Sequence, residues 1–258
     1  MRIASWNIDS IRARMALVEQ WVDVNDPDVL CLQETKVSER MFPRAPFIER
    51  GYELAIGESG GHGGVAMMSK LGLGRVEVGI PGAAPPLSDC RTISADVNGL
   101  RIHTIYGPNG RKVGTHHHDI KLAWLELFRA WVRMDGLDEG APTVVIGDIN
   151  IAPTDLDVWE AKRYRNRNLT SGPERESFQK LLDIGLVDVI RSHHGDEPVF
   201  TWWNRRSDFY ETDRGWRLDH ALADPATAEL VSAAFVDRAE RGRDGSSDHA
   251  PVVIDLSI

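Results

Sequence analysis

The amino-acid sequence predicts one α/β domain with a mixed sheet or two packed sheets. Short apolar runs typical of strands alternate with amphipathic helical segments along the whole chain, and no Pro-, Gly- or Ser-rich linker interrupts them. The hairpin signal Asn98-Gly99 adds an antiparallel pair of strands. The length of 258 residues suits one large domain. We therefore expect a single domain over residues 1–258.

Eight apolar segments have the length and composition of strands. Thr92–Val97 is the clearest, because Ile93, Ala95 and Val97 alternate with polar residues before the chain turns. The expected strands are Arg2–Trp6, Asp28–Leu32, Gly64–Ser69, Thr92–Val97, Leu100–Tyr106, Thr143–Ile146, Leu218–Ala223 and Pro251–Ile258.

Three segments are expected to be helices. Ser10–Val24 and Asp119–Met134 carry apolar residues at helical spacing, and Trp124 and Trp131 lie on the apolar stripe of the second. In the first, Ser10 or Asp9 is available as the cap. The third helix begins at a capping-box sequence, S-G-P-E, and ends at Gly185.

Three other segments are expected to be irregular. Glu160–Asn168 is too polar to bury and is expected to be the least ordered part of the chain. Consecutive histidines cannot all face one ion, so His116–His118 is expected to be a solvated loop rather than a metal site. The Gly-rich run Gly60–Gly64 lacks the Lys-Ser/Thr pair of a P-loop, so we expect a turn into the following strand.

Composition excludes several classes of protein. Asp and Glu exceed Lys and Arg by 39 − 30 = 9, so the chain does not coat nucleic acid by bulk charge, although a local basic face remains compatible. The two cysteines, Cys31 and Cys90, support neither a disulfide framework nor a thiolate zinc site. No apolar stretch approaches 18 residues, and the first ten residues do not form a signal peptide. A cytoplasmic protein without a membrane partner is expected.

Polar side chains follow the expected strands at the points where these end, or stand at the start of the next apolar run. Open α/β sheets place their sites beyond the carboxyl ends of strands, so these side chains are candidates for one shared site. They are Asn7, Asp9, Glu34, Tyr106, Asn109, Asp148, Asn150, Asp219, Asp248 and His249.

Five carboxylates of this set have no matching cluster of Lys or Arg in their own segments. Buried carboxylates are unfavourable unless they are paired or coordinate a cation. Carboxylate and amide oxygens without cysteine favour Mg²⁺ or Mn²⁺ over zinc. A divalent metal together with Asp, Asn, Tyr and His side chains supplies the groups needed for attack of water on a phosphodiester. The five are Asp9, Glu34, Asp148, Asp219 and Asp248.

Six motifs resemble, in order and spacing, those of exonuclease III, the apurinic/apyrimidinic (AP) endonuclease branch of the endonuclease/exonuclease/phosphatase fold. They are W-N-I-D-S-I-R-A-R, L-Q-E-T-K, Y-G-P-N-G-R, G-D-I-N-I-A-P-T-D-L-D, G-W-R-L-D-H and S-D-H-A-P-V. The resemblance implies a four-layer α/β sandwich, with two packed mixed β-sheets flanked by helices. Ser10, where a glycine is common, and the segment Glu160–Asn168 depart from the family pattern.

The resemblance also implies which residues hold the metal. Glu34, with Asn7 and Asp9 close by, would bind a divalent cation, expected to be Mg²⁺ with Mn²⁺ able to substitute. Asp248 would help to place the metal or the leaving group.

The same resemblance assigns the catalytic roles. Asp148 would orient and deprotonate the attacking water, and Asn150 would bind the phosphate beside it. His249, oriented by Asp219, would contact the scissile phosphate, to which Tyr106 would donate a hydrogen bond.

Substrate contacts follow from the resemblance and from the local charge. Asn109 would donate to the phosphate, while Trp202, or its neighbour Trp203, and Trp216 would line a pocket for a flipped-out abasic sugar. Seven basic residues are placed to contact DNA phosphates, although the arginines between 160 and 168 fit a merely solvated face equally well. The seven are Arg111, Lys112, Arg163, Arg165, Arg167, Arg205 and Arg206.

These observations lead us to expect a monomeric DNA repair nuclease that cleaves double-stranded DNA 5′ to abasic sites, degrades it from the 3′ end and trims blocked 3′ ends. A phosphodiesterase or phosphatase of the same fold, acting on RNA, lipid or inositol phosphates, is the nearest alternative. A non-catalytic DNA-binding relative is the alternative of another class, but such a protein is expected to have lost Asp148, His249 or Glu34.

Overall fold

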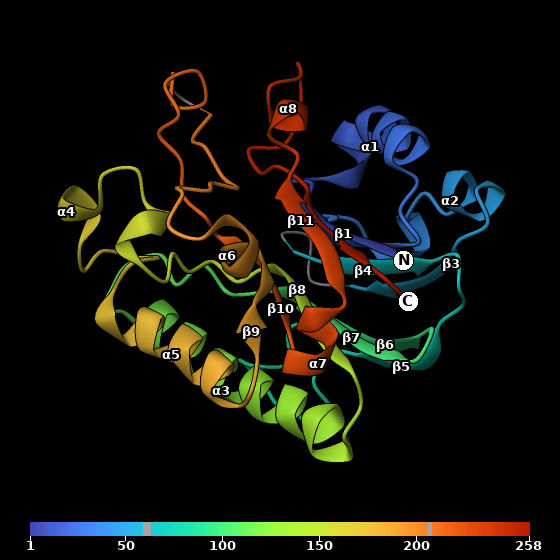
Figure 1. The fold of residues 1–258 in the computed structure, drawn as a ribbon, viewed down its shortest axis with the longest axis horizontal. Coiled ribbons are helices and arrows are strands. Elements are labelled where there is room, and N and C mark those ends of the chain that lie inside the picture. The colour runs from blue at the N-terminus through green and yellow to red at the C-terminus, as the bar shows by residue number, and fades with distance from the viewer. Residues whose placement is uncertain (59–62, 206–207) are drawn as a thin grey trace.

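Two six-stranded sheets pack face to face in the computed structural model, and helices cover their outer sides (Figure 1). The structure describes residues 1–58, 63–205 and 208–258. The architecture is the four-layer α/β sandwich with mixed sheets that the sequence predicts. None of the helices in these three ranges has the length and apolarity that crossing a membrane requires.

The first sheet has the order β11-β12-β1-β2-β4-β3. Its only parallel pair among the described strands is β1 with β2, in which Asn7 lies opposite Gln33. The strands are β1 (Arg2–Asn7), β2 (Val29–Gln33), β3 (Glu53–Gly57), β4 (Val65–Ser69), β11 (Val231–Val236) and β12 (Val252–Leu256).

The second sheet has the order β5-β6-β7-β8-β10-β9. Here β7 and β8 are parallel, whereas β10 runs antiparallel to β8, so that Asp219 lies opposite Asp148. The strands are β5 (Gly74–Val78), β6 (Thr92–Val97), β7 (Leu100–Tyr106), β8 (Thr143–Asp148), β9 (Val187–Asp188) and β10 (Asp219–Ala223).

The longest helices lie on the two outer faces of the sandwich, and two short ones contact both sheets at its edge. In Figure 1, α1 and α2 lie above the first sheet, and α3 and α5 lie below the second. The described helices are α1 (Ile11–Asn25), α2 (Ala45–Glu49), α3 (His116–Asp135), α4 (Ala161–Tyr164), α5 (Gly172–Asp183), α6 (Val189–His194), α7 (Pro225–Glu229) and α8 (Arg238–Arg241), with 3₁₀ turns at Glu39–Met41, Leu137–Glu139 and Asp155–Asp157.

Strand alternation divides the core into layers. In β1, Ile3 joins the apolar layer between the two sheets, whereas Ala4 and Trp6 face the layer under α1. A third layer packs Trp124 and other residues of α3 and α5 against the second sheet. Trp131 is also buried, as its place on the helical stripe predicts.

All eight predicted strands are present, and the four that the sequence did not reveal are β3, β5, β9 and β11. These four are the edge strands of the two sheets. Each of these edge strands is partly exposed, so it lacks the continuous apolar run that marks a central strand. The missed strands therefore have a common physical cause.

Two expectations about loops are wrong. His116–His118 forms the first turn of α3 rather than a solvated loop, and His118 is buried with its Nε2 3.2 Å from Ser171 Oγ. Glu160–Asn168 has no buried residue, as its polarity predicts, but it is not wholly irregular, because it contains α4, and Tyr164 packs its ring 4.9 Å from that of Trp216. One aromatic anchor orders this polar segment. Most of the predicted Gly60–Gly64 turn lies outside the described residues.

Candidate active site

The candidate site lies where the ends of strands from both sheets meet. Asn7 is the last residue of β1, and Glu34 directly follows β2. Tyr106 and Asp148 end β7 and β8 as register partners, and Asp219 begins β10 beside Asp148. The polar residues that follow these apolar runs are thus brought to one place.

Asn7 joins the two sheets at the centre of the site. Its buried Nδ2 donates to Glu34 Oε1 at 2.9 Å and to Asp148 Oδ2 at 2.9 Å. Ser247 Oγ donates to the Asn7 carbonyl, and Trp6 Nε1 donates to the His249 carbonyl at 3.1 Å. These bonds fix the loop that carries His249 against β1.

Asp219, His249 and Asp148 form a buried chain of titratable groups. His249 Nδ1 lies 2.8 Å from Asp219 Oδ2, and Thr201 Oγ1 donates to the same oxygen at 2.6 Å. On the other side of the ring, His249 Nε2 lies 3.9 Å from Asp148 Oδ2. The ligand-type atoms of these three side chains all lie within 4.8 Å of one another.

The electrostatics of this chain follow from its burial. Loss of hydration is the largest cause that raises the pKa of Asp148, and the charges of Asp219 and Glu34 add to it, while His249 and Asn7 oppose it. Burial disfavours the imidazolium of His249, but the Asp219 and Asp148 carboxylates outweigh burial and raise the pKa of that ring. His249 is therefore protonated at neutral pH, beside the Asp148 carboxylate, whose pKa is raised.

A second group of charges lies beside the first. Lys36 Nζ lies 2.7 Å from Glu34 Oε2 and also pairs with Asp9, and Arg205 Nη2 lies 2.7 Å from Asp9 Oδ2 and 3.4 Å from Asp248 Oδ1. Although burial opposes the shift, Lys36 and Arg205 lower the pKa of Asp9. The carboxylates that the sequence assigns to a metal are therefore close together and already attract cations.

Hydrogen-bond donors surround Asp148. Asn150 donates its backbone N–H to Asp148 Oδ1 at 2.9 Å, and its Nδ2 donates to Asp148 Oδ2 at 3.2 Å. Asn109 Nδ2 donates to Asn150 Oδ1 at 3.2 Å. Tyr106 hydrogen-bonds Glu34, and burial, with the charges of Glu34 and Asp148, raises the pKa of its phenol. Tyr106 therefore stays a neutral donor at physiological pH.

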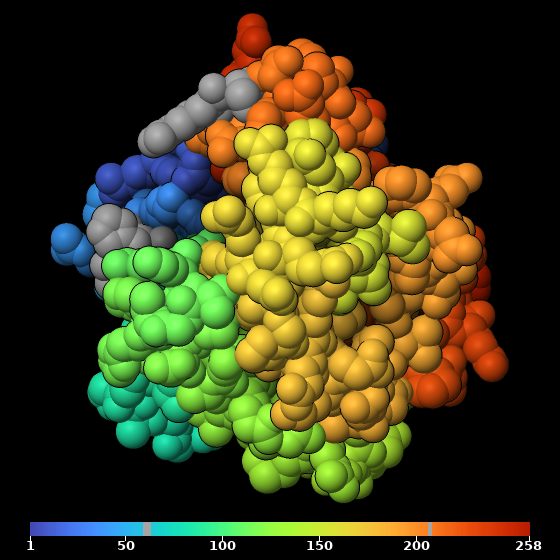
Figure 2. All heavy atoms as spheres, turned by 90° about the vertical axis from the view of Figure 1, so that its left-hand side faces the viewer, coloured from blue at the N-terminus to red at the C-terminus, as the bar shows by residue number. Residues whose placement is uncertain are grey.

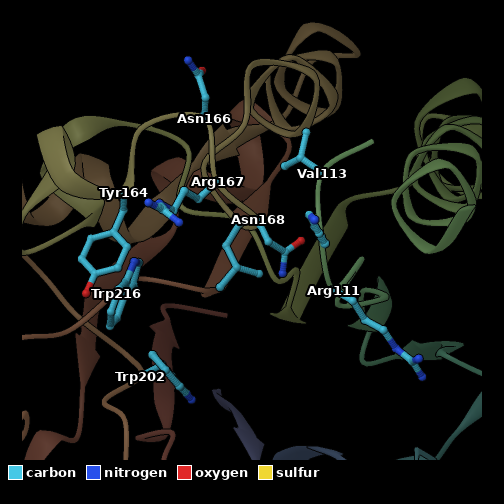
Figure 3. Close-up of a pocket in the computed structure, with 10 residues that line it drawn as sticks. Arg111, Val113, Tyr164, Asn166, Arg167, Asn168, Trp202 and Trp216 are labelled. Atoms are coloured by element: carbon cyan, nitrogen blue, oxygen red, sulfur yellow. The ribbon is translucent and has the colours of Figure 1, made fainter. Parts of the chain in front are cut away.

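An aromatic pocket of about 510 Å³ opens beside these residues (Figure 3). Trp202 and Trp216 form one wall, with ring centroids 5.0 Å apart. Trp202 Nε1 donates to Asp248 Oδ2 at 3.1 Å, which ties the wall to the charged groups. Trp203, by contrast, is buried against Tyr210, so of the two neighbours it is Trp202 that lines the pocket.

The predicted basic residues divide into two groups. Arg111, Lys112 and Arg167 line the pocket, and Figure 3 shows Arg111 opposite the two tryptophans. In Figure 2, the yellow segment around α4 lies between the green chain that follows β7 and the orange loop before β10. Two of the predicted cations, Arg163 and Arg165, instead pair with neighbouring carboxylates, as does Arg205, and Arg206 lies outside the described residues.

Sequence reasoning missed several residues that support the site. Lys36 lies within the motif L-Q-E-T-K and Thr201 directly precedes Trp202, but their contacts with Asp9 and Asp219 depend on long-range packing. Tyr164 completes the pocket from a segment expected to be irregular, and its aromatic ring in a polar stretch was the available signal. Arg217, two residues before Asp219, pairs with Asp157 and Asp188, each at 2.7 Å.

Comparison with known proteins agrees with the motif resemblance. The model of the Endonuclease/Exonuclease/phosphatase family matches residues 4–249. The chain is 29% identical to the exodeoxyribonuclease of Bacillus subtilis over all of both chains, and 32% identical to the DNA repair nuclease APEX1 of Danio rerio, covering all of this chain and 83% of that one.

Solved structures give the same picture. The 3′ phosphatase NExo from Neisseria, bound to product DNA hairpin, superimposes with a TM-score of 0.96 at 31% identity, with both chains fully covered. An AP endonuclease from Archaeoglobus fulgidus superimposes with a TM-score of 0.95 at 33% identity, again over the whole of both chains.

Proposed function

The chain belongs to the endonuclease/exonuclease/phosphatase family, and on that premise we propose that it is a Mg²⁺-dependent DNA repair nuclease acting 5′ to abasic sites and at blocked 3′ ends. Its relatives are hydrolases of DNA phosphodiester bonds, and those named above cover both activities. The observation that carries the proposal is the Asp219–His249–Asp148 chain beside a pocket walled by two tryptophans.

The residues near Glu34 fit a divalent cation. Glu34, Asp9 and Asp248 supply carboxylate oxygens and Asn7 supplies an amide oxygen, which is the donor chemistry that Mg²⁺ prefers. The ammonium of Lys36 already pairs with two of these carboxylates, so this place favours positive charge. A metal held there would neutralise phosphate oxygens and assist the leaving oxygen.

The residues of this chain perform the proton transfers. Asp148, whose pKa is raised, accepts a proton from the attacking water, and its bonds from Asn7 and Asn150 hold the carboxylate in one orientation. His249 Nε2 faces the same side and donates to a phosphate oxygen, while Asp219 stabilises the imidazolium.

The pocket accounts for the choice of an abasic site. Swinging a nucleotide out of the helix is easiest where no base pair must be broken. The aromatic wall of Trp202 and Trp216 offers an apolar surface to a bare sugar, and Asp248 holds one of its rings in place. We also propose that the enzyme acts as a monomer in the cytoplasm, a reducing compartment that suits its two free cysteines, Cys31 and Cys90.

Cleavage of three DNA duplexes tests the proposal. One carries an abasic analogue, one ends in a 3′-phosphate and one is unmodified, each with Mg²⁺ or with EDTA. We expect Mg²⁺-dependent incision of the first and release of phosphate from the second. Trp216→Ala should reduce the preference for abasic over intact DNA by about 1–3 kcal/mol, the scale of one aromatic contact to a nucleotide.

Trp131→Ala is the matched control, because Trp131 is as buried as Trp216 (8% and 6% exposed) but lies on α3 away from the pocket. It should lower the melting temperature without changing the preference. No activity on either damaged duplex, or equal loss of preference in the two variants, contradicts the proposal.

A further inference from the structure

A buried ion pair lies behind the candidate site and takes no part in the chemistry described above. Lys121 on α3 and Glu174 on α5 have fully buried side chains, and Lys121 Nζ lies 2.5 Å from Glu174 Oε1. A charge pair taken this far from water must recover its lost hydration through good geometry and further hydrogen bonds. Both partners do make such bonds, and one bond of each partner, to Asn150 and from Leu169, leads toward the site.

Lys121 holds the active-site loop from behind. Its Nζ donates to the Asn150 carbonyl at 2.7 Å. Asn150 has a φ of +60°, in the left-handed region that asparagine enters more readily than most residues. On the side of the site, Asn150 donates to both oxygens of Asp148, and its Nδ2 also donates to the Gly107 carbonyl at 2.9 Å. The ammonium therefore fixes the residue that orients the catalytic carboxylate.

Glu174 holds the pocket wall. Its Oε1 accepts the Leu169 N–H at 3.0 Å, and its Oε2 accepts the N–H and the hydroxyl of Ser171 at 3.0 and 2.6 Å. Leu169 lines the pocket and has a φ of +74°, a conformation that is uncommon for a leucine. Its carbonyl accepts the Ala152 N–H at 2.8 Å. The Glu174 carboxylate thus holds Leu169 of the pocket wall, and Leu169 in turn is bonded to the segment after β8 that carries Asn150.

We propose that the Lys121–Glu174 pair is a positioning device that sets the pocket wall at Leu169 relative to the carboxylate of Asp148. The inference rests on the proposed function, because it assigns the pair a role in that same site. Apolar side chains could fill the same volume, but they could neither donate to the Asn150 carbonyl nor accept from Leu169. The two charged side chains therefore fix the positions of Asn150 and Leu169, in addition to filling space.

The double variant K121M/E174M separates positioning from stability. Removing one partner leaves a buried unpaired charge, whereas removing both partners of a buried pair is often neutral for stability. We expect the double variant to melt below the wild-type temperature, because the Asn150 carbonyl and the Leu169 N–H lose their partners, but to stay folded at the assay temperature. Its single-turnover cleavage of the abasic duplex at saturating enzyme should nevertheless fall roughly 10²-fold, the scale of a displacement of about 1 Å between reacting groups. The Kd for DNA should stay near the wild-type value.

The matched control removes another buried pair that also has one partner on α3, Asp135. Arg101 Nη2 lies 2.6 Å from Asp135 Oδ2, and Arg101 belongs to the beginning of β7, away from the strand ends at the site. The variant R101M/D135M should cleave at the wild-type rate.

A K121M/E174M variant that melts cooperatively and cleaves at the wild-type rate overturns the inference. If that variant does not melt cooperatively, K121M/E174Q carries the test, because an amide at position 174 still accepts from Leu169 and no unpaired charge is left, while the donation to the Asn150 carbonyl is lost. A reduced rate at unchanged Kd then supports the inference, and a wild-type rate overturns it. Failure of the wild-type enzyme to cleave any duplex instead rejects the proposed function.

Discussion

The charge on Asp219 decides whether His249 is protonated at neutral pH. Asp219 Oδ2 lies 2.8 Å from His249 Nδ1. Burial works against the imidazolium, but Asp219 makes the largest of the contributions that raise the pKa of His249 to about 10. Asp219→Asn keeps the shape of the side chain and removes the charge. With burial still opposing the cation, the pKa of His249 should fall to about 6.5 or below.

The consequence is a change in the pH profile of cleavage. The wild-type imidazolium should persist to about pH 9, whereas in Asp219→Asn only about a tenth of the rings stay protonated at pH 7.5 and about a hundredth at pH 8.5. The ratio of variant to wild-type single-turnover rates should therefore fall tenfold per pH unit above about pH 6.5. Thr201→Val is the control, because it removes the other side-chain hydrogen bond to Asp219 but no charge. A variant-to-wild-type ratio that does not change with pH would refute the assignment of a protonated His249.

Four further predictions test other parts of the site. Asp148→Asn should lower the single-turnover rate by about 10²–10⁴ while DNA binding survives, and a loss of less than tenfold excludes Asp148 as the base. Glu34→Gln should raise the Mg²⁺ concentration needed both for half-maximal cleavage and for any thermal stabilisation by Mg²⁺, whereas full wild-type activity in excess EDTA excludes a metal. Replacing both Arg111 and Arg167 by alanine should flatten the slope of log Kd for DNA against log salt by about one to two units, and an unchanged slope means that this wall does not meet phosphates. Burial alone would raise the pKa of Asp157, but the guanidinium of Arg217 lowers it to about 2, below its ordinary 3.8. The ionised carboxylate therefore stabilises the fold above pH 4, and this effect is lost as the pH falls toward 2. Asp157→Asn should accordingly lower the free energy of unfolding at pH 7 by about 2 kcal/mol, a deficit that urea unfolding should find reduced near pH 3.

The sequence by itself determined the central strands and the candidate residues at their ends. A buried strand has a continuous apolar run, and a carboxylate directly after such a run is unfavourable unless it is paired or binds a cation, so Asp148 and Glu34 became candidates from their positions together with the rest of the set. The order of the motifs also implied the family and its four-layer architecture. These signals are local in the chain, which is why they can be read without coordinates.

Only the tertiary structure decided which side chains complete the site. The edge strands escaped prediction because half-exposed strands lack a distinctive apolar pattern. Tyr164 joined the pocket because one ring packs on Trp216, and the Lys121–Glu174 pair, 53 residues apart in the chain, formed because α3 and α5 pack side by side. Such contacts depend on distances between segments that are remote in sequence, and those distances are set by the packing of the layers, which no local pattern of residues encodes.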